Sequence, residues 1–397
     1  MNGKLLFGVA AVAVVAVFAI SYLAWGEDQM PPKDPDYQGE WYEVSSSLAI
    51  YDDFEPRIMT VDMSSSITVT KEGYFYTLSD GKPITAAVDL KNTLVIGTGA
   101  GTFTVASLVG DRLVVGSIDA NDQSAGSEVY TRTPTDQQAL PDGPGAEPDD
   151  LPPGGEAWMP QVGDVFTAYK AVEVSGSDVT DHIGRGYTLT VDALQGNLML
   201  YRVQYGDDGL KTLYFSSVKV GASDWMSATT IDGRTVLDMV HFSDGNVYTA
   251  SSETNGDVTV HWEVDYGDAG KDADVPDLVG KRFGGEERFR LLLNGTTEQV
   301  GSNTVSLEIV GQDGHFLDIR TVNVHGEVAL WGAMFFESER GYKFYAESYV
   351  TYGREDYKGI YMGSISDDLD MLDAAGAYGS DSGRITMVDQ EYQSDRS

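Results

Sequence analysis

Residues 67–78 read ITVTKEGYFYTL, and this stretch sets the architecture expected for the whole chain. Apolar and polar side chains alternate on both sides of Glu72 and Gly73. Alternation with a period of two is typical of a strand with one buried face, and a glycine between two such runs marks a hairpin turn. Similar hairpins recur as LTVDALQGNLMLY at 189–201 and as LEIVGQDGHFLDI at 307–319. The sequence therefore predicts an all-β protein with three similar parts.

Alternating runs of this kind fill three segments of the chain, residues 38–133, 159–266 and 278–392. Glycine, asparagine and aspartate separate the runs, as they do at tight turns between short strands, and they leave little room for helix. We expect three consecutive β-rich domains. Each is either a lipocalin-like barrel or a sandwich, because alternation gives a strand two faces without saying which face lies inside.

The three domains open in the same way, with a glycine shortly before a large aromatic residue. The pairs are Gly39 with Trp41, Gly163 with Phe166, and Gly280 with Phe283. Divergent copies of one domain would explain this repetition. Any meander of short strands would also produce a rhythm of this kind, so both interpretations stay open.

Residues 134–158 form a segment rich in proline and acidic residues, with no basic residue and little to bury. Such a composition gives a stiff, extended linker. We therefore expect the domains to be separate units with little shared interface. Residues 267–277 read as a shorter hinge, and residues 393–397 as a polar tail.

Residues 5–25, LLFGVAAVAVVAVFAISYLAW, contain no charged residue and no proline. A helix of about 20 apolar residues spans the hydrocarbon core of a bilayer. We expect a transmembrane signal anchor with residues 1–4 in the cytoplasm, a stalk at 26–37 and the three domains outside the cytoplasm. The alternative is a cleaved signal peptide, which usually has a shorter apolar core and a small-x-small cleavage site.

The chain carries 62 acidic and 26 basic residues, a formal net charge of −36. Nucleic acids bind through clustered lysine and arginine, so this charge excludes a nucleic-acid partner. The chain has no cysteine. Disulfides, thiolate metal sites and cysteine nucleophiles are therefore excluded as well.

The first domain resembles the lipocalin and wider calycin group of small β-barrels. The residues that carry the resemblance are Gly39-x-Trp41 in the opening strand and Tyr130-x-Arg132 in the closing strand. The resemblance implies an up-and-down barrel that holds a small apolar ligand. It also implies that Trp41 packs beneath the barrel floor with Arg132 over it, a cation–π contact of roughly 0.5–2 kcal/mol.

The other two domains depart from this pattern. Phe166 and Phe283 stand where the family has tryptophan, and the second domain lacks the closing arginine. In the third domain, Arg384 is a candidate equivalent of that arginine. The structural candidates for barrel closure are therefore Gly39, Trp41, Arg132, Phe166 and Phe283.

No catalytic, cofactor or metal-binding motif stands out. None of the five histidines lies in a metal-ligand spacing, and the acidic clusters at 119–122, 207–208 and 367–373 do not match the EF-hand loop. Asn294-Gly295-Thr296 matches the N-glycosylation sequon at an expected turn, where it could also be a plain Asn-Gly turn. We expect no catalytic residue, no cofactor and no metal.

These observations predict a membrane-anchored, extracytoplasmic binding or surface-display protein that is not an enzyme. One version holds a small apolar ligand in the lipocalin-like first domain. An alternative is a surface protein that binds another protein or a glycan through its repeated domains. A third alternative is a hydrolase that uses paired carboxylates.

Overall fold

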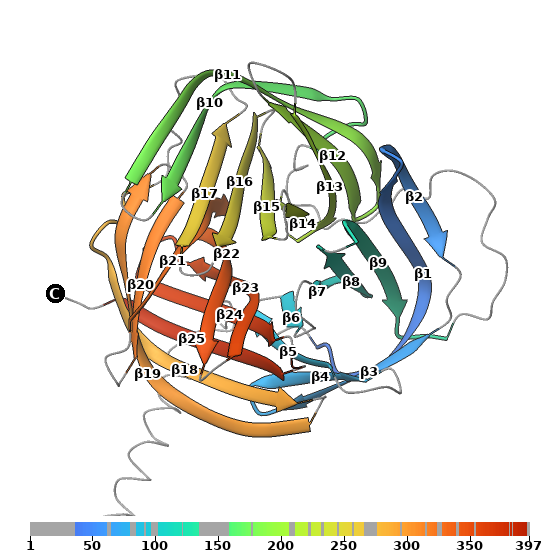
Figure 1. Ribbon diagram of the computed structural model, residues 1–397. Helices are drawn as coiled ribbons and strands as arrows, with labels where there is room; N and C mark the ends of the chain where they lie inside the picture. The colour runs from blue at the N-terminus through green and yellow to red at the C-terminus, as the bar shows by residue number, and fades with distance from the viewer. Residues whose placement is uncertain are drawn as a thin grey trace, which may run out of the picture. The chain divides into compact units, whose positions relative to one another are not determined.

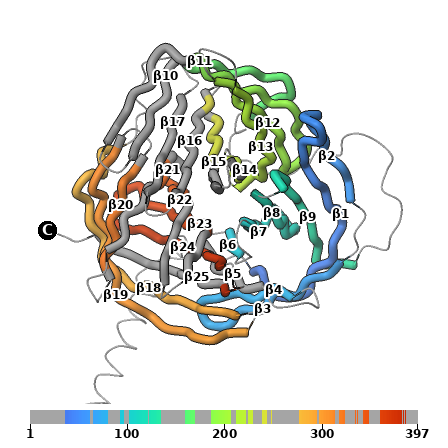
Figure 2. Tube along the Cα trace, in the orientation of Figure 1, coloured from blue at the N-terminus to red at the C-terminus, as the bar shows by residue number. Residues whose placement is uncertain are grey.

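The computed structural model consists of β-strands, and no helix occurs among the residues that it describes. These residues are 36–61, 65–79, 85–90, 93–96, 102–120, 122–134, 159–175, 178–205, 211–220, 224–231, 234–243, 246–255, 258–265, 276–293, 296–313, 316–323, 328–338, 341–352, 355–380, 382 and 384–394. Figure 2 traces the path of the chain along its Cα positions. The chain divides into two units, Met1–Asp36 and Tyr37–Ser397, and all described strands belong to the second. The prediction of an all-β protein is confirmed.

The first sheet, which we call barrel 1, is a meander whose ends meet (Figure 1). β1 pairs with β3 through residues 39–42 and with β9 through residues 42–50, so the strands other than β2 close into a ring. β2 pairs only with the second half of β1. The strands are β1 (Gly39–Asp52), β2 (Glu55–Val61), β3 (Ser66–Glu72), β4 (Phe75–Ser79), β5 (Thr85–Leu90), β6 (Thr93–Ile96), β7 (Thr102–Val109), β8 (Arg112–Asp119) and β9 (Ser124–Thr131).

Two further closed antiparallel barrels follow, in which each strand pairs with the next and the last returns to the first. Barrel 2 contains β10 (Val165–Ser175), β11 (Asp178–Gln195), β12 (Leu198–Tyr205), β13 (Lys211–Lys219), β14 (Asp224–Ile231), β15 (Arg234–Ser243), β16 (Asn246–Asn255) and β17 (Val258–Asp265). Barrel 3 contains β18 (Arg282–Leu293), β19 (Thr296–Asp313), β20 (Phe316–Asn323), β21 (Val328–Ser338), β22 (Gly341–Tyr352), β23 (Glu355–Ile365), β24 (Met371–Ser380) and β25 (Arg384–Ser394). These curled sheets fit a lipocalin-like β fold, and they are barrels rather than sandwiches.

The glycines that open the three barrels share an unusual backbone conformation. Gly39, Gly163 and Gly280 have φ angles of 120°, 92° and 84°. Residues with a side chain rarely adopt these values, which explains why glycine recurs at this place. In barrels 2 and 3 the amide of this glycine also donates an equivalent hydrogen bond, from Gly163 to the Val191 carbonyl and from Gly280 to the Ile309 carbonyl, both at 2.8 Å.

A bulge follows that hydrogen bond in both barrels. The strand register shifts between Val191 and Ala193 in barrel 2, and between Ile309 and Gly311 in barrel 3. The matching hairpin of barrel 1, residues 67–78, is one residue shorter and pairs without a shift. The hairpins matched in the sequence therefore occupy equivalent places, and the extra residue in the second and third is the bulge.

Each barrel has its own core, formed by one face of its strands. The largest fully buried side chains include Trp41 in barrel 1, Trp225 in barrel 2 and Phe344 in barrel 3. The opposite faces of many strands are buried too. On β6, for example, Leu94 and Ile96 belong to the core of barrel 1, whereas Val95 between them does not.

Val95 belongs to a second kind of core, shared by all three barrels. It is in one cluster with Val218 of barrel 2 and Met362 of barrel 3. At Gly116 on β8 the barrels come so close that a Cβ atom would lie 3.2 Å from the Val218 side chain. The prediction that the domains share little interface is therefore wrong. A strand that is buried on both faces has a continuous run of apolar residues in place of alternation. Such a run in a sequence indicates a contact of this kind.

Polar contacts also join barrel 1 to barrel 3. Arg290 on β18 is 9% exposed, and its Nη2 donates to Glu72 Oε2 at 3.0 Å. The guanidinium of the neighbouring Arg288 lies 3.8 Å from the ring centre of Tyr74, at the β3–β4 turn.

Several predicted segments fall outside the described residues. They are the cytoplasmic terminus at 1–4, the anchor at 5–25, nearly all of the stalk, and most of the linker at 134–158 and the hinge at 267–277. Within the described ranges, no helical segment has the length and hydropathy that a membrane crossing requires. At the other end, β25 continues to Ser394, inside the segment predicted as the tail.

Candidate functional site

Trp41, Arg132 and Gly39 meet at the point where barrel 1 closes. The guanidinium of Arg132 lies over the indole of Trp41, 3.9 Å from the ring centre, and Arg132 also donates to the Gln38 carbonyl. A Cβ atom on Gly39 would lie 2.5 Å from the Arg132 guanidinium, so a side chain at this position would displace it. The cluster joins the first and last strands of the barrel, and it is a structural element.

Tyr37 extends this cluster from the chain that precedes β1. Its carbonyl accepts a hydrogen bond of 2.8 Å from the Trp41 indole nitrogen, and its side chain is fully buried in the core of barrel 1. The prediction that the stalk continues through residue 37 is therefore wrong at its last residue.

The other predicted closure residues lie in barrels 2 and 3. Phe283 is fully buried in barrel 3, and Phe166 lies in barrel 2 with its ring centre 6.1 Å from that of Phe242. Arg384 is not the equivalent of Arg132, because it pairs with Leu293 at the far end of β18. The glycosylation candidate Asn294 lies outside the described residues.

A buried carboxylate and a histidine meet at a contact between barrels 2 and 3. Asp224 Oδ1 on β14 lies 2.6 Å from His241 Nδ1 on β15, directly opposite in the sheet. The hydroxyl of Tyr345, on β22 of barrel 3, donates to the other carboxylate oxygen at 2.8 Å. Both oxygens of Asp224 therefore have partners, and the arrangement links two barrels. In the described part of the chain, no group of three or more histidine, aspartate or glutamate side chains could hold a metal ion.

The surroundings keep Asp224 ionised despite its burial. Burial by itself would raise the pKa of Asp224, but the hydrogen bond and charge of His241, the charge of Lys343 and the Tyr345 hydroxyl hold that pKa below its usual value. Burial, together with the charge of Asp224 and the hydrogen bond to it, raises the pKa of Tyr345 well above its ordinary value. Tyr345 therefore remains a neutral donor to a charged acceptor.

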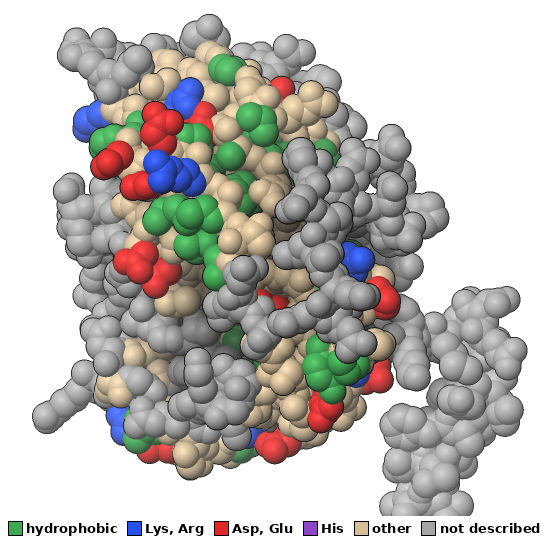
Figure 3. All heavy atoms as spheres, turned by 90° about the vertical axis from the view of Figure 1, so that its right-hand side faces the viewer, with side chains coloured by type: hydrophobic (Ala, Val, Ile, Leu, Met, Phe, Trp, Pro, Cys, Tyr) green, Lys and Arg blue, Asp and Glu red, His purple; other side chains and the backbone are tan. Residues whose placement is uncertain are grey.

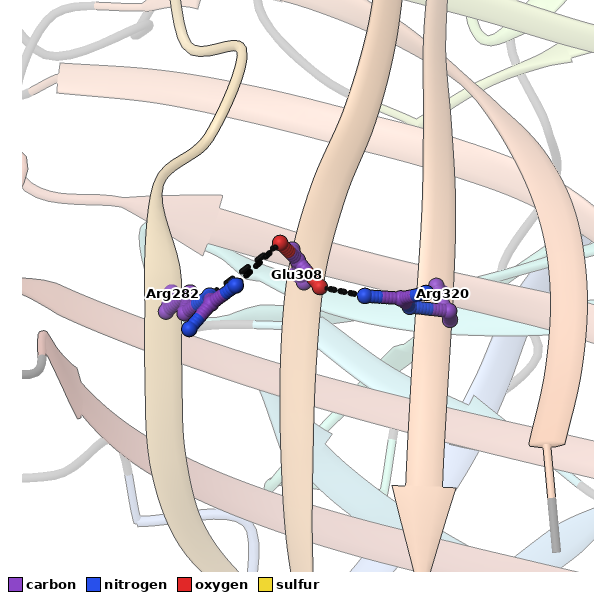
Figure 4. A network of polar contacts seen from close by, with 3 residues as sticks. All are labelled: Arg282, Glu308 and Arg320. Atoms are coloured by element: carbon purple, nitrogen blue, oxygen red, sulfur yellow. Dashed lines mark hydrogen bonds and ion pairs between the residues drawn. The ribbon is translucent and has the colours of Figure 1, made fainter.

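A second polar network crosses three strands on barrel 3 (Figure 4). Glu308 on β19 accepts two hydrogen bonds from Arg282 on β18, at 3.1 and 2.9 Å, and a further one from Arg320 on β20. The hydrogen bonds from Arg320 and Arg282 lower the pKa of Glu308. Since Glu308 engages both guanidinium groups, we interpret the network as a cross-strand ladder rather than an anion site.

The turn between β1 and β2 holds an aromatic side chain in a strained conformation. A two-residue turn at Asp53 and Phe54 connects the strands, and these residues have φ angles of 51° and 66°. Turns of this kind favour asparagine and glycine, and a bulky residue with positive φ is uncommon. Phe54 is nevertheless present, and it is 73% exposed.

Side chains of barrel 2 pack against this turn and the end of β1. The ring centre of Tyr214 on β13 lies 5.3 Å from that of Phe54 and 4.8 Å from that of Tyr51. The hydroxyl of Tyr51 donates at 2.9 Å to Asp192, the extra residue of the β11 bulge, which also accepts from Arg202. Burial, the charge of Asp192 and this hydrogen bond raise the pKa of Tyr51. We call Tyr51, Phe54 and Tyr214 the hairpin patch.

Figure 3 shows the side of the molecule on which β1 and β2 lie in Figure 1. Exposed hydrophobic side chains there stand among acidic and basic ones. Phe54 and Met59, which is 43% exposed, are the large apolar residues that the β1–β2 hairpin contributes to the surface.

Replacing Phe54 with glycine is expected to raise the free energy of unfolding by about 0.5–1 kcal/mol, because glycine adopts positive φ without strain. Thermal and denaturant unfolding followed by circular dichroism would measure the change. Tyr74→Gly is the matched control, since Tyr74 is an exposed aromatic residue at another hairpin turn with an ordinary φ. The control should lose stability; a loss in Phe54→Gly as well would show that Phe54 is not strained.

Comparison with known proteins gives no family. No family model matches the chain, and no curated protein matches it. Among solved structures, the intact two-lobed Ap-TbpB is 7% identical with a TM-score of 0.24, over 89% of this chain and 76% of that one. Transferrin binding protein B of Neisseria meningitidis is 8% identical with a TM-score of 0.23, over 89% and 63%. A protein of Bacteroides fragilis described as an outer membrane protein is 10% identical with a TM-score of 0.23, over 59% and 98%.

Similarities at these TM-scores identify neither a shared fold nor a function. A role for the hairpin patch therefore depends on its own geometry. Sequence reasoning missed it, although the β-prone runs LAIY and RIMTV flank residues 52–56 as they would flank a turn. An aromatic residue inside such a turn was the available signal.

Proposed function

We propose that this chain is a membrane-anchored, extracytoplasmic binding protein that recognises a protein partner through the hairpin patch. The supporting observation is Phe54, a large apolar side chain that is 73% exposed at a φ of 66°. Glycine or asparagine would serve the turn better. An exposed aromatic residue in a strained turn is therefore better explained by contact with a partner than by folding.

The patch has the properties of a binding hot spot. Aromatic residues dominate such sites because they contribute a large contact area with few rotatable bonds. Tyr51 and Tyr214 are held by ring contacts and by the Tyr51–Asp192 hydrogen bond, so little conformational entropy remains to be lost on binding.

The other proposed functions have less support. Large buried side chains, including Tyr37, Trp41, Tyr76 and Leu94, converge in barrel 1, and this packing disfavours an apolar ligand in its lumen. A hydrolase would need a carboxylate that is available to substrate, whereas both oxygens of Asp224 are engaged. We retain the prediction of a non-enzymatic protein and, for the same patch, a glycan as the alternative ligand.

The location can be tested on the intact chain in cells. We expect the protein to remain in membranes after a carbonate wash, and protease added outside intact cells to cleave it at 134–158. The first result is expected because residues 5–25 are apolar. The second is expected because the linker is rich in proline and acidic residues and has little to bury. Recovery of uncleaved protein in the soluble fraction would contradict the proposal.

The partner can be sought with a photoreactive amino acid at position 54 of the full chain in its own membrane. We expect a crosslinked protein product at position 54 and none at position 300, where Val300 is 63% exposed on barrel 3. A crosslink to carbohydrate would favour the glycan alternative. Identical products at both positions, or no product at position 54, would refute the patch as the binding site.

A further inference from the structure

β2 differs from every other described strand in pairing with a single strand. Barrels 2 and 3 are closed, and the strands of barrel 1 other than β2 each have a partner on both sides. β2 pairs with β1 from Asp52↔Glu55 to Ser46↔Val61, and no described strand pairs with its outer edge. An edge of this kind presents backbone donors and acceptors to a further strand.

The turn fixes which backbone groups face outward. In a hairpin with a two-residue turn, the residues flanking the turn exchange both hydrogen bonds, and the pairs then alternate along the strands. Glu55, Arg57 and Met59 therefore direct their backbone groups toward β1. Residues 56, 58 and 60 direct theirs outward, and since proline has no N–H, the donors on the outer edge are those of Ile58 and Thr60.

The two faces of β2 have different surroundings. Ile58 packs against the shared core and fixes the strand, while Met59 is 43% exposed on the other face. Edge strands are usually protected by charged residues, proline or bulges. Here Pro56 lies next to the turn, and Arg57 forms an ion pair with Asp52 at 2.6 Å. The β-prone residues 58–61, IMTV, contain neither a charge nor a proline, and they pair with β1 without a bulge.

Charge selects the kind of strand that fits. Asp52, Asp53 and Glu55 surround the turn, and Arg57 is the basic residue of β2. A second copy of the chain would bring another net charge of −36 to this acidic turn, whereas a basic segment would be attracted to it.

We propose that β2 binds an extended, basic segment of a protein partner as an additional strand, beside the hairpin patch. The proposal rests on the proposed function and specifies how the partner is held. Backbone hydrogen bonds to Ile58 and Thr60 would align the segment, and Met59 and Phe54 would contact its apolar side chains. Lysine or arginine in the segment would lie near Asp53 and Glu55.

The test uses the full chain in detergent and the synthetic peptide KVTVKVTVK, with EVTVEVTVE as the matched acidic control. We expect the basic peptide to bind in calorimetric titrations and to lose affinity with added salt, and the acidic peptide not to bind. Methylating alternate peptide amides should weaken binding about tenfold or more in one register and little in the other, because only one set faces β2. Equal effects in both registers, or no binding of the basic peptide, would overturn the proposal.

Thr60→Pro tests the same edge from the side of the protein. Its N–H faces away from β1, so the variant should fold, as unfolding curves and circular dichroism would verify, and bind the peptide about tenfold more weakly. Unchanged affinity in the folded variant would overturn strand addition. If Thr60→Pro proved unfolded, the methylated peptides would decide the matter.

Failure of this inference can be distinguished from failure of the proposed function. A partner crosslinked at position 54 whose binding survives Thr60→Pro would refute strand addition and leave the hairpin patch in place. A dimer in sedimentation experiments that disappears in Thr60→Pro would show that a second copy occupies β2, and would overturn the partner proposed here.

Discussion

Replacing Trp41 with alanine is expected to lower the free energy of unfolding by about 3–5 kcal/mol, the range found for buried aromatic residues in protein cores. Trp41 is 1% exposed, so the substitution leaves a cavity inside barrel 1. It also removes the hydrogen bond to the Tyr37 carbonyl and the ring beneath Arg132. Denaturant unfolding followed by circular dichroism, with hydrogen exchange of the β1 amides, would measure the loss and locate it.

Trp41→Phe is the control for this prediction. Phenylalanine already stands at the matching positions 166 and 283 of the other domains, so an aromatic ring of this size is compatible with a barrel of this kind. The variant should retain much of the stability lost in Trp41→Ala. An unchanged unfolding curve for Trp41→Ala would mean that Trp41 does not hold the closure of barrel 1.

Replacing Asp224 with alanine is expected to destabilise the chain by about 3–5 kcal/mol as well, because it removes a buried carboxylate and its hydrogen bonds to partners in two barrels. The partners are His241 in barrel 2 and Tyr345 in barrel 3. Tyr345→Phe removes one hydrogen bond to a charged group and should cost less, about 1.5–3 kcal/mol. Equal stability of Asp224→Ala and the unchanged protein would show that the contact does not hold the two barrels together.

The same residue predicts how stability depends on pH. The folded pKa of Asp224 is lowered, so the folded state binds the proton more weakly than the unfolded state does. Its contribution is therefore complete above the unfolded pKa of about 4, and it is lost as the pH falls through the lower folded pKa. Unfolding measured between neutral and acidic pH should show a shallower loss in Asp224→Asn than in the unchanged protein. If the two proteins lost the same free energy of unfolding as the pH falls, this assignment would be contradicted.

Much of the local structure could be predicted from residue patterns. Alternation at 67–78, 189–201 and 307–319 predicted hairpins that the structure contains, because a half-buried strand requires a side-chain period of two. The glycines before Trp41, Phe166 and Phe283 marked a backbone conformation that other residues rarely adopt. Both signals depend on a few neighbouring residues, which is why they could be read without the tertiary structure.

The Asp224–Tyr345 contact and the hairpin patch could not be predicted from local residue patterns. Asp224 and Tyr345 are 121 residues apart, and neither stands in a motif, so their contact exists only because the outer faces of barrels 2 and 3 pack together. The hairpin patch likewise combines Tyr51 and Phe54 of barrel 1 with Tyr214 of barrel 2. The proline-rich composition of the linker suggested separate domains. That prediction failed because the composition concerns the connecting chain and not the surfaces of the barrels.

The sequence by itself determined that the chain is all-β and where its strands turn, since alternation and turn residues act over distances of a few residues. The tertiary structure alone decided that barrels 1, 2 and 3 share one apolar core and that no described strand pairs with the outer edge of β2. The shared core depends on which of the two faces of a strand packs against another barrel. The edge of β2 depends on which strands pair with each other. A period of two leaves both choices open, and long-range packing settles them.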